Sequence, residues 1–153
     1  MKKYNFIIAI LFTFSPDAII TVFGRQKVNI VEKGGDEVKM FNARQDFFGG
    51  DYRSAVNKYK EVLRNRPSDG AVRFFLGECY YMMRDYNSAL EFLEKAKSLN
   101  PNAHEELYLV LGKTYHAKCR LDNALTEYYE YKKVIKNDAK KITTSEIDIY
   151  IAQ

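Results

Sequence analysis

The side chains that could perform acid–base, nucleophilic or metal chemistry are few in this sequence. Among its 153 residues are two histidines and two cysteines: His104, His116, Cys79 and Cys119. His104 is expected in the first turn of a helix and His116 on a helix face without an acid or a cysteine at ligand spacing. The spacing of the two cysteines fits neither a metal site nor a redox motif. The adjacent Glu105 and Glu106 are better explained as favourable charge at a helix N-terminus than as catalytic carboxylates. We therefore expect no enzyme, no cofactor, no metal and no small-molecule substrate.

Composition excludes several other classes of protein. Hydrophobic residues make up 46% of the chain and charged residues 29%, which excludes a disordered chain and a membrane protein of many spans. The formal net charge is +4, and basic residues alternate with acids along most of the chain. This excess is too small to predict a nucleic-acid partner. A module that stacks RNA bases on Tyr80 and Tyr81 beside nearby lysines stays an alternative.

The elements that carry these residues follow a short pattern with a period of 34 to 35 residues. The pattern runs Leu76, Gly77, Tyr80, Ala89, Leu93, Ala96 and Pro101. It returns after these residues as Leu111, Gly112, Tyr115, Ala124, Tyr128 and Tyr131, and it precedes them as Ala43, Ala55, Tyr59, Val62 and Pro67. Self-similarity at this period indicates a stacked array of helical hairpins, in which function lies in what the array holds.

Each copy of the pattern predicts two helices. The six predicted helices are residues 36–48, 52–65, 70–83, 86–98, 103–118 and 121–136. Asp51, Asp85 and Asn102 stand where a side chain can accept hydrogen bonds from the first backbone N–H groups of a helix. Pro67 and Pro101 follow the second helix of their pairs and end it.

The order of small and aromatic residues resembles the tetratricopeptide repeat, and residues 70–102 match that repeat at nearly every signature position. The resemblance implies an all-α, right-handed solenoid of three helix-turn-helix repeats, at 36–69, 70–103 and 105–138, with a short C-terminal capping helix. Gly77 and Ala89 are small because the two helices of a hairpin cross there.

The resemblance also implies a partner-binding site in the concave groove, which the first helix of each repeat lines. The residues expected there are Met40, Arg44, Phe47, Phe74, Glu78, Tyr81, Leu109, Lys113 and His116. Spacings of four and three place each set of three on one helix face. A mixture of aromatic, methionine and charged side chains suits a partner helix or an extended peptide. For Phe47, Phe74 and Tyr81, packing against neighbouring helices is the alternative.

One groove chemistry of this family is disfavoured. Repeats that hold the terminal carboxylate of a chaperone tail do so with lysine, asparagine and arginine on successive first helices. The corresponding positions here are Met40, Arg44, Glu78, Leu109 and Lys113. Glu78 would repel a carboxylate, so we do not expect recognition of a chaperone tail.

The N-terminal segment differs in character from the repeats. Lys2 and Lys3 precede apolar residues that continue, with an interruption at Pro16 and Asp17, as far as Gly24. This layout predicts a signal peptide over residues 1–24, followed by a linker over 25–35. A retained membrane anchor is the alternative, although Pro16 and Asp17 disfavour a stable span.

At the other end, residues 143–153 predict the start of a capping helix that is short for this role, which suggests a fragment of a longer polypeptide. The layout of signal, repeats and abrupt end is similar to the N-terminal part of Bacteroidetes-type OmpA-family envelope proteins. We therefore expect a non-enzymatic protein–protein interaction scaffold that binds a protein or peptide partner. Its expected location is the periplasm or the outer membrane of a bacterial envelope, in an outer-membrane or peptidoglycan-associated complex. The alternative is an assembly or secretion accessory factor anchored in the inner membrane.

Overall fold

A computed structural model describes residues 34–136, Asp148 and Ala152. The chain divides into two compact units, Met1–Val38 and Lys39–Gln153, and the helix pairs lie in the second. Of the first unit, residues 34–38 are described and are helical. The predicted signal peptide (1–24), most of the linker (25–33) and most of the capping helix (143–147, 149–151 and 153) lie outside the described residues. The helix already includes Gly34 and Gly35, so the predicted linker ends earlier than expected.

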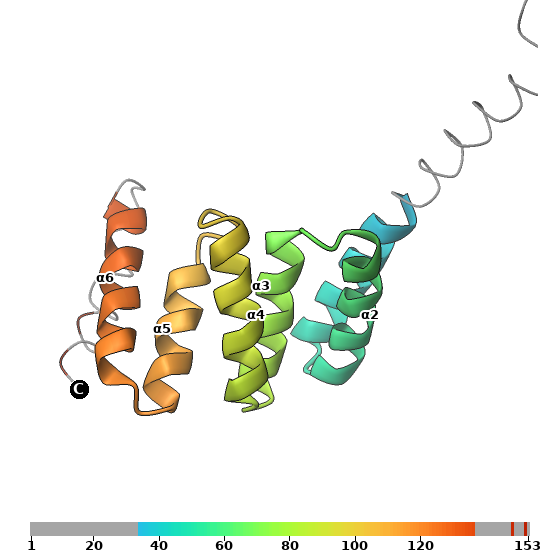
Figure 1. Cartoon of the computed structure of the whole chain (residues 1–153). Helices are drawn as coiled ribbons and strands as arrows, with labels where there is room; N and C mark the ends of the chain where they lie inside the picture. The colour runs from blue at the N-terminus through green and yellow to red at the C-terminus, as the bar shows by residue number, and fades with distance from the viewer. Residues whose placement is uncertain (1–33, 137–147, 149–151, 153) are drawn as a thin grey trace, which may run out of the picture. The chain divides into compact units, whose positions relative to one another are not determined.

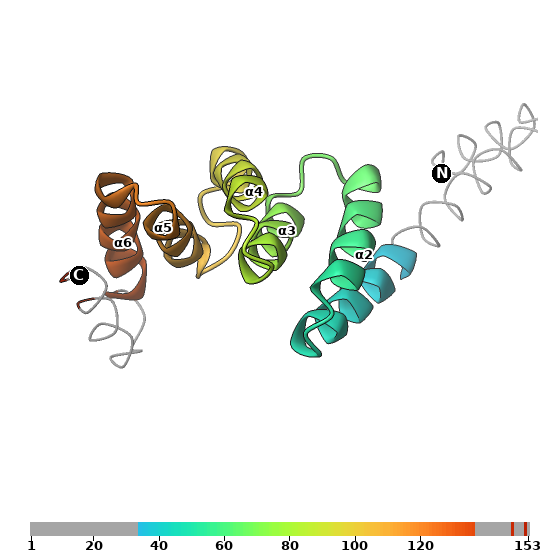
Figure 2. The ribbon, with the colours of Figure 1, turned by 90° about the horizontal axis from the view of Figure 1, so that it is seen from below.

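The described part of the chain is built from α-helices and contains no strand. Residues 34–48 form the first helix, which α2 (Tyr52–Asn65), α3 (Gly70–Met82), α4 (Tyr86–Leu99), α5 (Leu107–Ala117) and α6 (Leu121–Lys136) follow. The pairs α3 with α4 and α5 with α6 are hairpins, and α2–α3 and α4–α5 contacts join successive pairs (Figures 1 and 2). The all-α repeat architecture expected from the sequence is confirmed.

Helix boundaries agree with the prediction except at α5. The bounds of α2 and α6 match, and those of α3 and α4 differ by one residue. The expected start of the fifth helix at 103, with Asn102 as its cap, is wrong, because α5 begins at Leu107. Side chains hold the preceding residues in turns: Asn100 Oδ1 accepts from Asn102 N–H at 3.0 Å, and His104 Nδ1 accepts from Glu106 N–H at 3.2 Å. Local hydrogen bonds of this kind compete with helix formation.

The turns inside the three hairpins share one backbone conformation. Gly50, Arg84 and Cys119 have positive φ angles of 83°, 63° and 56° at equivalent positions. In each turn, the N–H of the next residue donates to the carbonyl five residues earlier, at 2.9 to 3.0 Å. This is the Schellman ending of a helix, for which glycine is the usual residue. Arg84 and Cys119 adopt the left-handed conformation, which residues other than glycine disfavour, because the Schellman ending of the helix requires it.

Aspartate side chains begin three of the helices. Asp51 accepts from Ser54 N–H at 3.0 Å and Asp85 from Ser88 N–H at 3.2 Å, so both predicted caps are confirmed. Asp69 caps α3 in the same way, although the sequence analysis did not select it. Each of these carboxylates satisfies backbone donors that a helix N-terminus leaves without partners.

Close approach explains the glycines at the helix crossings. A Cβ atom on Gly77 would lie 2.5 Å from Leu93 Cγ, and one on Gly112 would lie 2.5 Å from Tyr128 Cε1. Ala89 and Ala124, on the opposite helices, are buried as well. The prediction that small residues allow each hairpin to close is therefore confirmed for Gly77 and Ala89.

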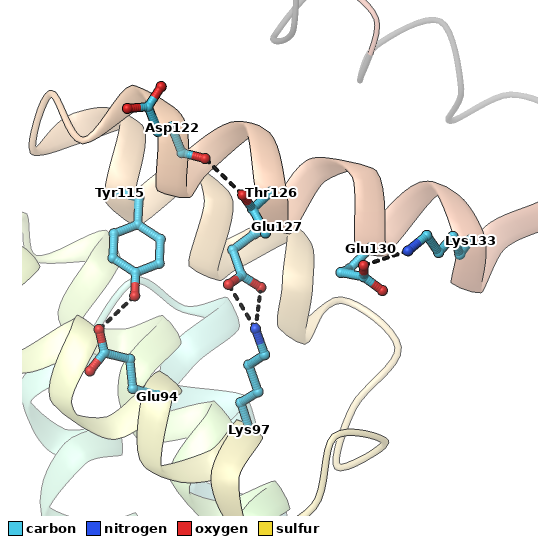
Figure 3. Close-up of polar contacts among 8 residues, drawn as sticks. All are labelled: Glu94, Lys97, Tyr115, Asp122, Thr126, Glu127, Glu130 and Lys133. Atoms are coloured by element: carbon cyan, nitrogen blue, oxygen red, sulfur yellow. Dashed lines mark hydrogen bonds and ion pairs between the residues drawn. The ribbon is translucent and has the colours of Figure 1, made fainter.

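The second and third hairpins are joined by polar contacts that Figure 3 shows. Tyr115 Oη on α5 donates to Glu94 Oε1 on α4 at 2.6 Å. Lys97 Nζ, also on α4, donates to both carboxylate oxygens of Glu127 on α6, at 2.7 and 2.8 Å. The Glu127 side chain is 8% exposed, so this ion pair reaches into the interior. The hydrogen bond therefore joins α4 to α5, and the ion pair joins α4 to α6.

On α6, Lys132 forms an ion pair with Asp148, a described residue near the C-terminus. Lys132 Nζ lies 2.6 Å from Asp148 Oδ1, and Asp148 is helical. Among the described residues, no helix is long and apolar enough to cross a membrane.

Candidate functional site

The first helices of the three pairs form one layer. The Arg44 guanidinium carbon lies 5.2 Å from the centre of the Phe75 ring, which joins the first helix to α3. Contacts between α3 and α5 continue the layer. We call the side of this layer that carries Arg44, Glu78 and Lys113 the first-helix face. These three residues occupy equivalent positions in their helices, so the face presents positive, negative and positive charge in order.

The nine predicted site residues differ in exposure. Arg44 is exposed, whereas Met40, Phe47, Glu78, Tyr81, Lys113 and His116 are half-buried. Phe74 and Leu109 are buried. Seven of the nine are therefore accessible in part, and the two buried residues support the face from below.

The expectation that Phe74 lines the surface is corrected by its environment. Its ring is fully buried and stacks on the His104 imidazole, with centroids 4.0 Å apart and planes 9° apart. Phe75 meets the edges of both rings. Leu109 is likewise part of the hydrophobic core. For Phe74 the packing alternative is the one that the structure shows.

His104 supports the first-helix face from the turn before α5. The sequence had predicted that it lies in a helix. Its ring covers Phe74, and its Nδ1 accepts a hydrogen bond from Glu106 N–H, so the ring joins the turn before α5 to α3. Burial lowers the pKa of His104, against the opposing effect of Glu106 and Glu105. The imidazole is thus held neutral against an aromatic surface. No sequence motif marked this role, since only the turn at 101–106 brings His104 over Phe74.

Phe47 and Tyr81 each combine packing with exposure. Phe47 makes edge contacts with Phe48 and Tyr52, at centroid distances of 5.7 and 5.4 Å. Tyr81 meets the Tyr86 ring at 5.9 Å. Both side chains are therefore positioned by a neighbouring aromatic ring while part of their surface remains accessible.

Glu78 is the central charge of the face, and its environment changes its ionisation. Burial raises the pKa of Glu78 to about 7, the Glu106 carboxylate adds to this effect, and Arg44 and Lys113 oppose it. The carboxylate is partly protonated at neutral pH because two cations do not fully offset its loss of water. Its hydrogen-bonding character therefore changes with pH in the neutral range.

Three large apolar side chains on the face were missed by the sequence analysis. Phe41 is 62% exposed, Phe48 76% and Met82 44%. Phe41 and Phe48 lie three residues before and four after Arg44, and Met82 lies four after Glu78. The signal that could have found them is this common offset, which repeats after 34 residues.

The cysteines do not contribute to the face. Both are free thiols: Cys79 is buried and Cys119 is exposed. Burial raises the pKa of the Cys79 thiol to about 12, so it is an unreactive core side chain. Among the described residues, no group of three or more histidine, cysteine, aspartate or glutamate side chains is placed to hold a metal ion.

Residues 49–108 match the family described as tetratricopeptide repeat. The match runs from the first hairpin turn to the second residue of α5 and includes the whole second hairpin. Residues 49–108 thus form tetratricopeptide repeats. The repeats explain the equivalent turns, the small residues at the helix crossings and the ordered charges of the first-helix face.

Known proteins similar to this chain differ from it in length. A segment of 102 residues is 28% identical to "BBSome complex member BBS4" of Bos taurus, covering 67% of this chain but 19% of that protein. The chain thus spans about a fifth of the relative's length.

Two solved structures have similar folds. One is a complex of the TPR2B domain of yeast Sti1 with pHsp70 (TM-score 0.69, 18% identity, 76% of this chain and 93% of that one). The other is the type III secretion chaperone SycD of Yersinia enterocolitica with a peptide of the translocator YopD (TM-score 0.69, 15% identity, 76% and 88%). These similarities show the fold.

Proposed function

We propose that this tetratricopeptide repeat protein is a non-enzymatic scaffold that holds a partner peptide or helix on its first-helix face. The observation that carries the proposal is the accessible mixture of aromatic and charged side chains there, centred on Arg44 and Glu78. Aromatic residues and arginine are the side chains that most often dominate protein–protein binding. The solved relatives with a bound peptide support the same role for this fold.

The chemistry of the face favours a partner without a free carboxyl terminus as its anchor. Burial raises the pKa of Glu78, and the nearby Glu106 carboxylate raises it further. A further carboxylate placed at the centre would add to this repulsion. We therefore expect internal segments of a partner protein, and not a terminal carboxylate, to occupy the centre of the face.

A photocrosslinking experiment tests this function. A benzophenone amino acid replaces Tyr81 or His116 on the first-helix face, or Tyr129 on α6, which is 52% exposed and serves as the matched control. In extracts of the source cells, we expect a partner to crosslink from positions 81 and 116 and not from 129. Crosslinks from 129 alone, or an equal yield at all three positions, would show that the first-helix face is not the binding surface.

We also propose that the protein is exported to a bacterial cell envelope, as the charge and hydropathy of residues 1–24 suggest. Sequencing the N-terminus of the protein isolated from its own cells tests this proposal. A start at Arg25 supports export with cleavage, whereas a retained Met1 in the membrane fraction supports the anchored alternative. Recovery of the uncleaved chain from the cytosol would contradict both.

A further inference from the structure

The start of α5 differs from the starts of α2, α3 and α4. At each of those three helices, an aspartate side chain accepts hydrogen bonds from the first backbone N–H groups. At α5, the Glu106 side chain makes no capping hydrogen bond. The acceptor there is the His104 imidazole, whose Nδ1 atom accepts from Glu106 N–H at 3.2 Å. An aspartate cap keeps its charge down to about pH 4, whereas a histidine gains a charge near neutral pH.

The turn that carries His104 is seated on α3 at two places. The His104 ring stacks on Phe74, with centroids 4.0 Å apart and planes 9° apart. Four residues earlier on α3, the turn approaches Gly70 so closely that a Cβ atom there would lie 3.1 Å from Ala103 Cβ. The turn closes with a hydrogen bond from Leu107 N–H to His104 O at 3.2 Å. It therefore joins the beginning of the third hairpin to the second.

Only the neutral form of His104 can accept the bond from Glu106. Protonation places a hydrogen on Nδ1, so that this atom can donate but cannot accept. The new positive charge would also lie at the N-terminal end of α5, where the helix dipole is unfavourable to cations. Because the ring is half-buried, its charge would be poorly hydrated as well. Protonation thus opposes the arrangement that holds the turn.

Charged groups from the turn and from the first helix act on the imidazole. Glu105 and Glu106 favour the protonated ring, whereas Arg44 disfavours it. Burial has the largest effect, and it lowers the pKa of His104 from its usual value of 6.5. The folded chain therefore holds this proton less tightly than an open turn would. The closed turn has its full stability above pH 6.5 and loses stability as the pH falls below that value.

Glu78 on α3 titrates with the opposite sign. Burial raises its pKa to about 7, Glu106 raises it further, and Arg44 and Lys113 lower it. Acid therefore neutralises Glu78 and relieves its repulsion with Glu106, which works against any loosening that His104 causes. An experiment on His104 has to separate the two groups for this reason.

We propose that His104 is an acid-sensitive latch: its neutral imidazole holds the turn at 100–106 on α3, and its protonation releases the turn and the start of α5 from the second hairpin. The release loosens the junction between the second and third hairpins, while α5 and α6 keep their own contacts with each other. The inference goes beyond the proposed function, because it concerns the array itself and needs no bound partner.

Hydrogen–deuterium exchange of the full chain tests the latch. Exchange of residues 100–108 is measured at pH 7.5 and at pH 5.5 and is corrected for the intrinsic effect of pH on amide exchange. In the wild type, we expect about fivefold less protection of this segment at the lower pH, which corresponds to the loss of one neutral hydrogen bond. Protection of α2 should change much less, because Asp51 caps that helix.

Three variants assign the effect. His104→Phe keeps an aromatic ring on Phe74 but cannot be protonated, so its protection of the turn should be equal at the two pH values. His116→Phe is the matched control, because it removes the other histidine of the chain, which lies on α5 outside the turn, and it should keep the wild-type pH effect. Glu78→Gln removes the opposing carboxyl group, so its loss of protection in acid should exceed that of the wild type.

Several results would overturn the latch. Equal protection at the two pH values in both the wild type and Glu78→Gln is one, and an undiminished pH effect in His104→Phe is another. A loss in acid that is equally large in α2 would show general destabilisation instead. An NMR titration of the wild type gives a test without any variant: the Glu106 amide and the His104 ring should titrate with one midpoint, and two different midpoints would contradict the inference.

Discussion

One boundary joins the first hairpin to the second, and another joins the second to the third. Equivalent positions at these two boundaries carry side chains of different polarity. At the first boundary, Lys60 lies over the Tyr80 ring, 5.5 Å from its centre, and at the second, the equivalent Glu94 accepts a hydrogen bond from Tyr115. Leu63 at the first boundary packs against the hydrophobic core, whereas the equivalent residue at the second is Lys97, in an ion pair with Glu127.

The aromatic residues reinforce this contrast. Phe92, which is equivalent to Glu127, stacks on Tyr80 at 5.5 Å with planes 8° apart. Tyr59 stacks on Phe75 across the first boundary, also at 5.5 Å. One backbone arrangement therefore accommodates both an apolar and a charged boundary, because the buried Glu127 carboxylate is paired with Lys97. What differs is the dependence of each boundary on salt and on hydrogen-bond partners.

The largest expected effect comes from removing a buried aromatic ring at the first boundary. Tyr59→Ala removes a ring that is 1% exposed and loses its stacking on Phe75. We expect the free energy of unfolding to fall by about 3 kcal/mol, as for other large buried aromatic residues. Urea denaturation measures this loss, which should be the same in low and high salt. A loss below that of Tyr115→Phe would show that the first boundary does not depend on aromatic packing.

Breaking the ion pair tests the polar boundary. Glu127→Ala leaves Lys97 without its carboxylate, and because Lys97 is 34% exposed it can recover part of its hydration. The expected loss in free energy of unfolding is about 2 kcal/mol, less than for a fully buried pair. Measured in low and in molar salt, the difference between wild type and variant should shrink as salt rises. An equal difference at both salt concentrations would mean that packing, not charge, holds this boundary.

Glu78 lies where the two boundaries meet, since Arg44 acts on it from the first helix and Lys113 from α5. Its pKa is raised from 4.5 to about 7 in the folded chain, so the folded state holds the proton more tightly than the unfolded state. Its contribution to stability is full below pH 4.5 and is lost as the pH rises to about 7.

Because glutamine does not ionise, Glu78→Gln should remove the loss of stability that the wild type shows as the pH rises. We expect the variant to gain about 1 kcal/mol over the wild type at pH 8, after allowance for solvent at a partly exposed group. Thermal denaturation between pH 4 and 8 would measure the gain. Parallel pH profiles for wild type and variant would contradict the raised pKa.

The smallest effect distinguishes the two equivalent tyrosines. Tyr115→Phe removes the hydrogen bond to Glu94 and should cost about 1 kcal/mol. Tyr80→Phe keeps the stacking on Phe92 and should cost less. Chemical denaturation of the two variants side by side compares the boundaries at matched positions. If Tyr80→Phe were the more damaging change, the contrast between the boundaries would be reversed.

Much of the helical framework could be predicted because its signals are local. Asp51 and Asp85 begin helices through hydrogen bonds to residues three positions away, and the small residues at 77 and 89 recur with the repeat. The start of α5 was predicted wrongly because it depends on a contact between residues far apart in the chain. Its start depends on His104, which stacks on Phe74 some thirty residues earlier in the chain.

The binding role of the candidate site stays a prediction, and the structure shows how its residues are placed. Periodicity placed Arg44, Glu78 and Lys113 on one face, but it selected Phe74 where Phe75 is the accessible neighbour. A helical pattern predicts the side of a helix that faces a groove to within about one residue. It does not show which edge of that side the next helix covers. Phe41 and Phe48 were therefore missed although their spacing is regular.

The amino-acid sequence alone determined the repeat, the number of helix pairs and the order of charges along the first-helix face, because capping, small-residue crossings and turns act over short distances. Tertiary structure decided which aromatic side chains are exposed, how Arg44 reaches Phe75, and why the pKa of Glu78 is raised to about 7. Burial and the distances between charges depend on how neighbouring helices approach, and that approach is set by side chains far apart in the sequence.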